Sequence, residues 1–235
     1  MKKITILTGA GISKESGIET FRDNNNGTWA NYNVDDVATP MGWLKNQKLV
    51  LEFYNQRRRQ ILTAEPNAGH IGLVELEKNF DVTIVTQNID SLHERAGSKK
   101  VLHLHGEILK SQSSKYPELV YDCIGDINVG DKCENGSQLR PFVVWFGEAV
   151  PNIMTAEGLT FDADIFVVIG TSLQVYPAAG LIARTRPECK KIIIDPEIPE
   201  FNAAYKDKII AIRKPATTGV RELIDILFKE LETHA

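Results

Sequence analysis

The sequence predicts an α/β protein built on a doubly wound parallel sheet. Short apolar runs alternate with longer segments of helical periodicity along the 235 residues. The run Ile165–Ile169 is apolar throughout, which is typical of a strand covered on both faces. Polar or glycine-containing motifs follow several of these runs, and ligands of such sheets bind beyond the carboxyl ends of the strands. We therefore expect one main domain with a smaller inserted module, and a ligand site at that edge.

The order of the expected elements follows from these patterns. Strands are expected at Ile4–Leu7, Asp81–Thr86, Val101–Gly106, Phe142–Gly147, Ile165–Ile169, Lys191–Ile194 and Ile209–Ile212. Helices are expected at Met41–Ala64, where Pro66 ends the pattern, at Ala68–Lys78, from Pro177 onward and at Gly219–Leu231. The polar segment Asp23–Thr28 predicts a loop over the ligand. Residues 107–140 are rich in polar residues and indicate a weakly cored insertion.

The composition is ordinary for a globular chain, with 43% hydrophobic and 25% charged residues. A net charge of -4 gives no reason to expect nucleic acid or an anionic membrane as a partner. No apolar run is long enough to span a bilayer, and the N-terminus has no signal-peptide pattern. Three cysteines are too few for a disulfide framework. We expect a cytoplasmic monomer with reduced thiols.

The first expected strand runs directly into Gly9-Ala10-Gly11, with Ser13 two residues beyond. Glycines at such a junction let a ligand approach the backbone closely, and a helix N-terminus attracts a pyrophosphate. The third glycine of the dehydrogenase fingerprint would fall on position 14, which is Lys14. The loop therefore indicates a dinucleotide site that departs from the dehydrogenase pattern.

Each further motif has an ordinary explanation when it is taken alone. Asn88 and Asp90 are common turn formers, His105 ends an expected strand, and Gly170-Thr171-Ser172 is compatible with a simple helix cap. The motifs nevertheless occur together and in a fixed order: Gly9–Ser13, Thr86–Asp90, His105-Gly106, Arg140-Pro141 with Val143–Glu148, Gly170–Leu173 and Val175–Ala178. Independent coincidence of all of them is improbable.

Over essentially the whole chain this series closely resembles the sirtuins, the NAD-consuming protein lysine deacylases. The resemblance implies a Rossmann-like NAD-binding domain formed by residues 1–29, 66–106 and 147–235. It also implies a small domain formed by two insertions, a helical module at 30–65 and a degenerate zinc-ribbon-like module at 107–146. The acyl-lysine segment of a protein substrate would lie between the two domains.

The resemblance also assigns roles to individual residues. Catalytic roles are implied for His105, Asn88 and Asp90. NAD contacts are implied for Gly9, Ala10, Gly11, Ser13, Thr20, Phe21, Arg22, Gln87, Asn88, Ile89, Asp90, Gly170, Thr171, Ser172, Asp195, Pro196, Glu197 and Ala216. The family usually has asparagine where Asp195 stands. The implied products are nicotinamide, O-acyl-ADP-ribose and free lysine.

The expected general base is His105 rather than His103. The two histidines alternate along one expected strand and therefore share a face. His105 is the residue before Gly106 and occupies the position of the family motif. A histidine suits the deprotonation of a ribose hydroxyl because it titrates near neutral pH.

Tyr54 and Arg57 lie three positions apart on an expected helix and so share one face. Taken alone, this pair on an arginine-rich helix is usually solvated surface. In the family context it resembles the acyl-carboxylate motif of the class III, desuccinylase-like sirtuins, and Ala38 resembles the small residue that leaves room for a longer acyl chain. Val144, Phe146 and Gly147 are expected to contact the substrate as well. We therefore expect succinyl or malonyl groups, with acetyl as a poorer or parallel substrate.

A structural zinc ion is expected to be absent. The small domain of the family usually carries four cysteines in two Cys-x-x-Cys pairs, whereas this interval holds only Cys123 and Cys133. The region of the first pair reads Ser111-Gln112-Ser113-Ser114. A closed structural zinc site needs four nitrogen or sulfur ligands. A site completed by the carboxylates of Asp122 or Glu134 is the alternative.

Other functions remain open at the level of sequence. An oxidoreductase is disfavoured by the missing third glycine and by the lack of a hydride-transfer motif. An inactive module that binds ADP-ribose or acyl-lysine is disfavoured because Asn88, Asp90 and His105 occur together. Within the enzyme interpretation, the protein would alternatively be mainly a deacetylase, or a mono-ADP-ribosyltransferase on the same fold.

Overall fold

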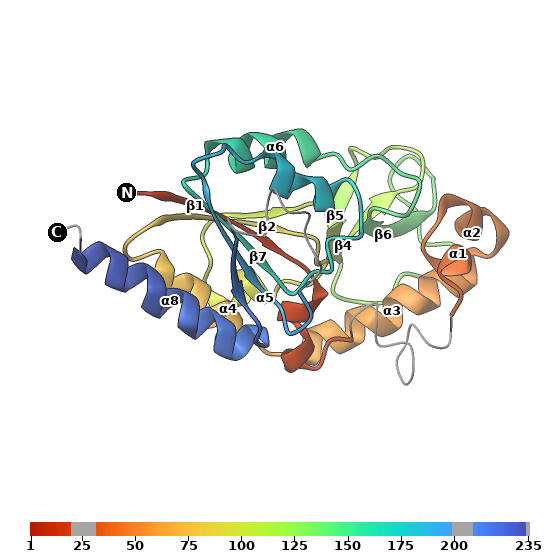
Figure 1. Cartoon of the computed structure of the whole chain (residues 1–235). Helices are drawn as coiled ribbons and strands as arrows, with labels where there is room; N and C mark the ends of the chain where they lie inside the picture. Colours follow the sequence, from red (N-terminus) through yellow and green to blue (C-terminus); the bar gives the residue numbers. More distant parts are fainter. Residues whose placement is uncertain (20–31, 199–208, 234–235) are drawn as a thin grey trace.

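The computed structural model describes residues 1–19, 32–198 and 209–233. Its larger sheet has six strands in the order β3-β2-β1-β7-β8-β9 (Figure 1). These strands are β1 (Lys3–Thr8), β2 (Asp81–Thr86), β3 (Val101–His103), β7 (Ile165–Ile169), β8 (Lys190–Ile194) and β9 (Ile209–Ile212). Every neighbouring pair is parallel. The strand order reverses between β1 and β7, which confirms the doubly wound topology and places a ligand-binding crevice beyond the ends of these two strands.

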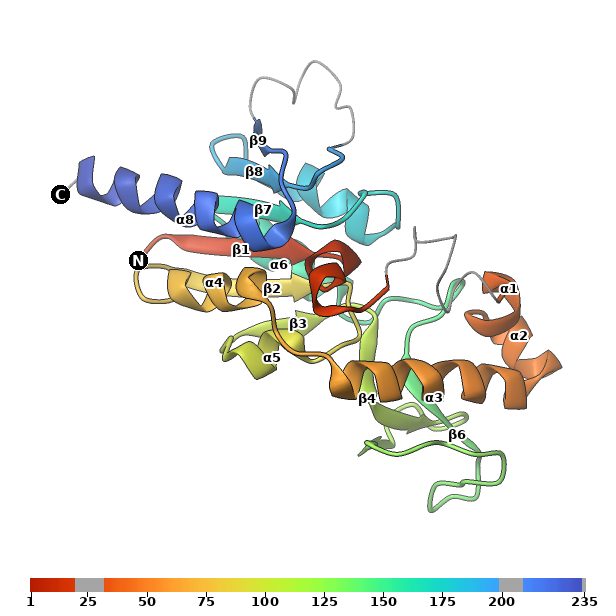
Figure 2. The ribbon, with the colours of Figure 1, turned by 90° about the horizontal axis from the view of Figure 1, so that it is seen from below.

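Helices cover both faces of this sheet. Helices α4 (Ala68–Leu76) and α8 (Ala216–Thr233) lie on one face, and Figure 2 views the molecule from that side. Helix α6 (Ile153–Asp162) and the 3-10 helix η4 (Ala178–Arg184) lie on the other face (Figure 1). Two short 3-10 helices, η1 (Ala10–Ile12) and η2 (Lys14–Ser16), follow β1, and α5 (Leu92–Ala96) follows β2.

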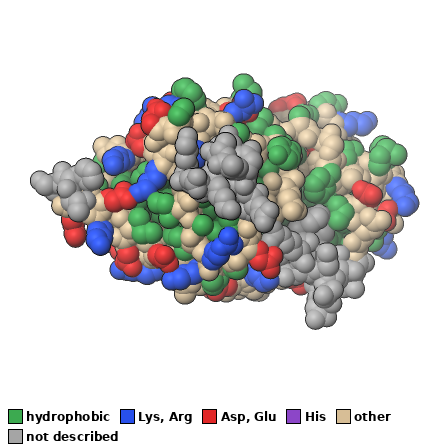
Figure 3. Space-filling view, in the orientation of Figure 1, with side chains coloured by type: hydrophobic (Ala, Val, Ile, Leu, Met, Phe, Trp, Pro, Cys, Tyr) green, Lys and Arg blue, Asp and Glu red, His purple; other side chains and the backbone are tan. Residues whose placement is uncertain are grey.

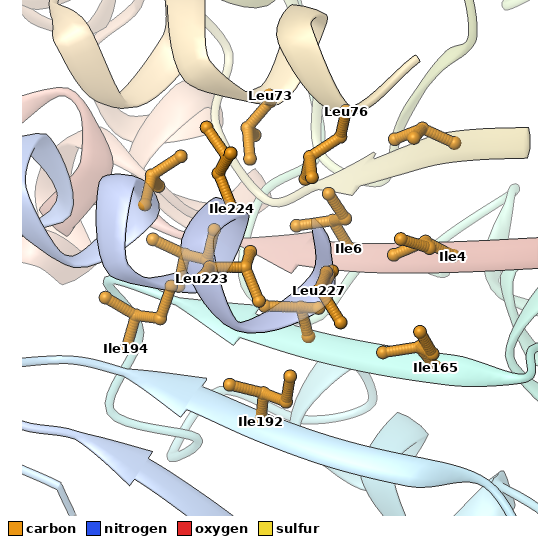
Figure 4. Close-up of a cluster of buried hydrophobic side chains, with 14 of the residues drawn as sticks. Ile4, Ile6, Leu73, Leu76, Ile165, Ile192, Ile194, Leu223, Ile224 and Leu227 are labelled. Carbon is orange, nitrogen blue, oxygen red and sulfur yellow. The ribbon is translucent and has the colours of Figure 1, made fainter. Parts of the chain in front are cut away.

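The helices on both faces of the sheet explain why its strands are continuously apolar. Side chains alternate between the two faces of a strand. Ile4 and Ile6 of β1 therefore pack with Leu73 of α4 and Leu223 of α8 (Figure 4). Leu7, by contrast, belongs to the cluster on the opposite face, which includes residues of α6 and η4. Each central strand thus buries both of its faces and needs apolar residues at successive positions.

A second, antiparallel sheet has the strand order β5-β4-β6 and lies beside α3 (Gln47–Thr63). Its strands are β4 (Gly106–Ser113), β5 (Val120–Asp122) and β6 (Leu139–Val143), and two short helices, α1 (Val34–Val37) and α2 (Pro40–Lys45), precede α3. A third apolar cluster joins these elements, with Phe53 of α3 packed together with Ile108 and Val143 of the small sheet. The polar segment after residue 106 therefore has a core that it shares with the helices.

Two of the expected elements are interrupted in the structure. The helix expected over Met41–Ala64 breaks at Asn46, whose φ of -155° is not helical and whose side chain caps α3 by accepting from the N–H of Leu49. The strand expected to run to Gly106 ends at His103. Gly106 begins a strand of the other sheet with a φ of +84°, a conformation that favours glycine.

Other boundaries also differ from the expectation. The strand expected at Phe142–Gly147 lies earlier, at Leu139–Val143, because it pairs with β4. The last helix begins at Ala216 rather than at Gly219, and the helix after Pro177 is a 3-10 helix. Helices α5 and α6 were not expected from the sequence.

The surface carries charges of both signs. On the face shown in Figure 3, acidic and basic side chains are interspersed and neither forms a continuous patch. In residues 1–19, 32–198 and 209–233, no helix combines the length and the apolar character that a membrane span requires.

Replacing Leu73 by alanine tests the packing of α4 on the sheet. Leu73 is fully buried, so Leu73→Ala is expected to lower the free energy of unfolding by about 2–5 kcal/mol, measured by urea denaturation. Ile71 on the same helix is 57% exposed, and Ile71→Ala is expected to change the free energy of unfolding by less than about 0.5 kcal/mol. Equal effects of the two substitutions would contradict this packing.

Candidate active site

A cavity of about 690 Å³ opens beyond the carboxyl ends of the central parallel strands. Its walls include Gly9 after β1, Gln87 after β2 and Gly170 after β7. The opposite wall is formed by α3 and by the segment that follows β6. The volume lies in the range of about 300–1,000 Å³ that is usual for ligand sites. The cavity therefore lies between the two sheets, at the switch point of the larger one.

The structure brings most of the site residues expected from the sequence to this cavity. It is lined by Gly9, Ala10, Gly11, Ala38, Tyr54, Arg57, Gln87, Asn88, Ile89, Asp90, His105, Val144, Phe146, Gly147, Gly170, Thr171, Ser172, Asp195, Pro196, Glu197 and Ala216. Ser13 lies behind the wall and contacts two of these residues. Thr20, Phe21, Arg22 and the loop Asp23–Thr28 lie outside the described residues.

The two glycine loops cross at very close range. The N–H of Gly11 donates to the carbonyl of Gly170 at 2.8 Å, and the N–H of Gly9 donates to the carbonyl of Ile169 at 3.0 Å. A Cβ atom on Gly11 would lie 2.6 Å from the Cα of Gly170. The glycines are therefore needed for the crossing itself. The crossing places bare backbone on the cavity wall, an arrangement that fits a dinucleotide pyrophosphate.

A buried hydrogen-bonded group at the cavity wall consists of Asn88, Ser13 and Asp90. The side-chain amide of Asn88 donates to the carbonyl of Gly9 at 3.2 Å and to the hydroxyl of Ser13 at 3.1 Å. The Ser13 hydroxyl donates to the carboxylate of Asp90 at 3.0 Å. Burial raises the pKa of Asp90, and the donors Leu92 N–H and Ser13 partly offset this effect. The group fixes the positions of Asn88 and Asp90 at the wall.

His70 on α4 completes this group and was not expected from the sequence. Its Nε2 lies 3.4 Å from the Ser13 hydroxyl, and its Nδ1 accepts the N–H of Asn67 at 3.3 Å. Burial lowers the pKa of His70 to about 4, so the ring is neutral at neutral pH. Because Nδ1 is an acceptor, the proton lies on Nε2 and is donated to Ser13. The sequence feature that could have indicated His70 is its spacing from Asn67, because the two residues form a capping box at the start of α4.

His103 and His105 have different environments. The Nδ1 of His105 lies 3.0 Å from the carbonyl of Gln87, so it carries the proton and Nε2 is the basic nitrogen. Burial lowers the pKa of His105, although this carbonyl partly offsets the effect. Burial also lowers the pKa of His103, but contacts with Glu94 at 2.8 Å and with the carbonyl of Asn88 at 3.0 Å, together with the charge of Glu107, raise it overall. Of the described histidines, only His105 lines the cavity.

Tyr54 and Arg57 are buried in the wall of the same cavity. Their exposed fractions are 5% and 7%, so the alternative of a solvated helix face is wrong. Burial raises the pKa of Tyr54 to about 12 and lowers the pKa of Arg57. The charges of Glu19 and Asp90 act in the opposite direction on Arg57. Ala38, with its small side chain, lines the cavity as well.

Several further residues at the cavity were given no individual role by sequence reasoning. The most informative is Trp145, whose indole N–H donates to the hydroxyl of Tyr54 at 3.1 Å. Lys14, Glu15, Glu19, Glu148 and Tyr176 also line the cavity. Trp145 lies within the motif Val143–Glu148, but the motif does not indicate its contact with Tyr54, because the two residues are far apart in the sequence.

The residues of the small sheet do not fit a closed zinc site. Cys133 Sγ lies 3.2 Å from the hydroxyl of Ser137 and 3.5 Å from that of Ser113. Cys123 Sγ contacts the carbonyl of Gly125. Over the three described stretches, no three or more His, Cys, Asp or Glu side chains come together as a possible metal site. Two thiols and two hydroxyls are not the donor set that structural zinc requires.

Comparison with known proteins identifies relatives over nearly the whole chain. A model of the Sir2 family matches residues 9–177. The NAD-dependent protein deacylase of Helicobacter pylori (strain 26695) is 48% identical, covering 97% of this chain and 99% of the relative. The NAD-dependent protein deacylase of Bacteroides thetaiotaomicron is 50% identical, covering 97% of this chain and 98% of the relative.

Solved structures give the same result. The crystal structure of a Sir2 homologue in complex with NAD is 34% identical and superposes with a TM-score of 0.87, covering 98% of this chain and 91% of that one. An ADP-ribose complex of a mutant Sir2 homologue has the same identity and TM-score and covers 94% of that chain. The match of the family model and the identity to these relatives confirm the resemblance drawn from the motifs, and the chain belongs to the Sir2 family.

Proposed function

We propose that this protein is an NAD-dependent protein-lysine deacylase that prefers succinyl and malonyl groups and also accepts acetyl groups. The products are nicotinamide, O-acyl-ADP-ribose and free lysine. The observation that carries the acyl preference is the burial of Arg57 and Tyr54 in the cavity that also contains His105. A guanidinium and a phenol together match a carboxylate at the end of an acyl chain.

The crossing loops are the proposed NAD site. Gly9, Ala10, Gly11, Gly170, Thr171 and Ser172 hold the phosphates and riboses, and Asp195, Pro196, Glu197 and Ala216 lie toward the adenosine. Gln87, Asn88, Ile89 and Asp90 surround the nicotinamide. We also assign Thr20, Phe21 and Arg22 to this site, and this assignment rests on the sequence alone. When bound, NAD supplies an activated ribose carbon by losing nicotinamide. The relatives named as NAD-dependent deacylases support this assignment.

His105 is the proposed general base. Its Nδ1 proton is held by the carbonyl of Gln87, so Nε2 is the nitrogen that accepts a proton from a ribose hydroxyl. The lowered pKa keeps the ring neutral at pH 7, as a base requires. The group formed by Asn88, Ser13 and Asp90 holds the nicotinamide end in place.

The substrate is proposed to be an acyl-lysine segment of another protein, bound against Val144, Phe146 and Gly147. The division into a domain of residues 1–29, 66–106 and 147–235 and a small domain of 30–65 and 107–146 is part of the same proposal. Cytoplasmic location and a monomeric state remain predictions from the sequence, as does the absence of nucleic-acid and membrane partners. Acetyl-lysine as the main substrate, or ADP-ribosyl transfer, is the alternative.

Replacing His105 by alanine tests the catalytic assignment. His105→Ala is expected to reduce deacylation by a factor of about 10² or more while NAD binding, measured by calorimetry, persists. His103→Ala serves as the matched control and is expected to retain most of the turnover. In the parent enzyme, kcat/KM is expected to fall on the acid side only below about pH 6.5, because the pKa of His105 is lowered. Loss of activity in the His103 variant alone would contradict the assignment.

Replacing Arg57 by methionine tests the acyl preference. Arg57→Met is expected to raise KM for a succinyl-lysine peptide by about ten- to hundredfold, since a buried carboxylate loses its charged partner. KM for the matching acetyl-lysine peptide is expected to change far less. Mass spectrometry of the products from both peptides measures the two reactions. An equal rise in KM for both peptides, or no succinyl turnover by the parent enzyme, would contradict the proposal.

The small domain is proposed to fold without structural zinc. Elemental analysis of the purified protein is expected to find well under one zinc per chain. A chelator is expected to leave the thermal unfolding midpoint unchanged, because apolar packing and hydroxyl contacts hold the small sheet. One equivalent of zinc, removed by chelator with loss of the fold, is the result that would refute this.

A further inference from the structure

The hydrogen bond between Trp145 and Tyr54 has only one possible direction. The indole Nε1 lies 3.1 Å from the phenol oxygen. An indole N–H can only donate, whereas a phenol has one proton and two acceptor lone pairs. The indole therefore donates and Tyr54 accepts. This direction reserves the proton of Tyr54 for a second acceptor, and Tyr54 lines the cavity in which such an acceptor would lie.

The indole ring is held rigidly by its surroundings. Trp145 is 2% exposed and packs against Trp43 with a distance of 5.6 Å between ring centroids. The guanidinium carbon of Arg140 lies 3.3 Å from the centroid of Trp145, as a cation over the ring. Both carboxylate oxygens of Glu148 accept from Arg140, at 2.7 and 3.0 Å. The same carboxylate accepts the backbone N–H of Trp145 at 2.8 Å. The indole N–H that donates to Tyr54 is therefore held in place by the Arg140–Glu148 ion pair and by the stacking of Trp145 on Trp43.

Tyr54 is also in the right protonation state to donate. Burial raises the pKa of Tyr54 to about 12, so the phenol keeps its proton at neutral pH. Arg57 lies on the same helix three residues later and lines the same cavity. A terminal carboxylate of an acyl chain would accept from both groups, whereas the methyl group of an acetyl chain would accept from neither.

We propose that Trp145 is a positioning residue for acyl selection, which directs the hydroxyl proton of Tyr54 toward the terminal carboxylate of a dicarboxylic acyl-lysine. The inference rests on the proposed preference for succinyl and malonyl groups and deepens it. Trp145 acts through Tyr54 and contributes to the binding of the acyl chain. Its role is therefore expected in KM for carboxylated substrates rather than in kcat.

The substitution Trp145→Phe tests this role because it removes the indole N–H and keeps an aromatic ring. KM for a succinyl-lysine peptide is expected to rise about three- to tenfold, the effect of one hydrogen bond, with kcat nearly unchanged. KM for the acetyl-lysine peptide of the same sequence is expected to change less than about twofold. Trp43→Phe is the matched control, since it removes an indole from the same stack and leaves the bond between Trp145 and Tyr54 in place.

A double-mutant cycle separates positioning from packing. In a Tyr54→Phe background, Trp145→Phe is expected to have no further effect on KM for the succinyl peptide, because the hydroxyl that it positions is absent. Equal increases in KM for both peptides, or additive effects in the double variant, would show a packing role and overturn the inference. Succinyl turnover by the parent enzyme with an unchanged KM in Trp145→Phe would overturn this inference alone. Absence of succinyl turnover in the parent would overturn the proposed acyl preference and the inference together.

Discussion

The active-site region depends on the close crossing of two loops at the switch point of the parallel sheet. A side chain on Gly11 would overlap the backbone of Gly170, so the loops after β1 and β7 approach at backbone contact. This approach brings together groups from strands that are far apart in the sequence. The side-chain amide of Gln87, after β2, donates to the hydroxyl of Thr171, after β7, at 3.1 Å. The wall proposed to bind NAD is therefore a consequence of sheet topology and of two residues without side chains.

Buried polar groups around this crossing are stable because they satisfy one another. Ser13 accepts from Asn88 and His70 and donates to Asp90, so each of its hydrogen-bonding positions is used. Burying a polar group without a partner costs about 1–3 kcal/mol, which explains why these residues form one connected set. Arg57 is buried at the cavity wall, where a guanidinium gains most from an anionic ligand. The cavity wall thus combines this buried cation with the hydrogen-bonded group of Asn88, Ser13 and Asp90.

The small sheet is attached to α3 by contacts that need no metal. The side chain of Asn55 donates to the carbonyl of Ile127 and accepts its N–H, both at 2.9 Å. Arg58, which is fully buried, donates to the carbonyl of Ile108 at 2.9 Å. In these bonds, side chains of α3 pair with backbone groups of the insertion. A neighbouring strand would otherwise provide such partners. The segment after β6 contacts the same helix through the bond from Trp145 to Tyr54.

The parallel sheet, the succession of its strands along the chain and the glycine, asparagine and histidine motifs at their ends were predictable from the sequence, because strand patterns and strand-terminal motifs are local. The sequence also located Tyr54 and Arg57 on one helix face, since three-residue spacing is a local property. The burial of this face, however, depends on tertiary contacts. The break at Gly106, the contact of His70 with Ser13 and the bond from Trp145 to Tyr54 were likewise decided by the tertiary structure. Each of these joins residues far apart in the chain, and the periodicity of a sequence carries no information about such contacts.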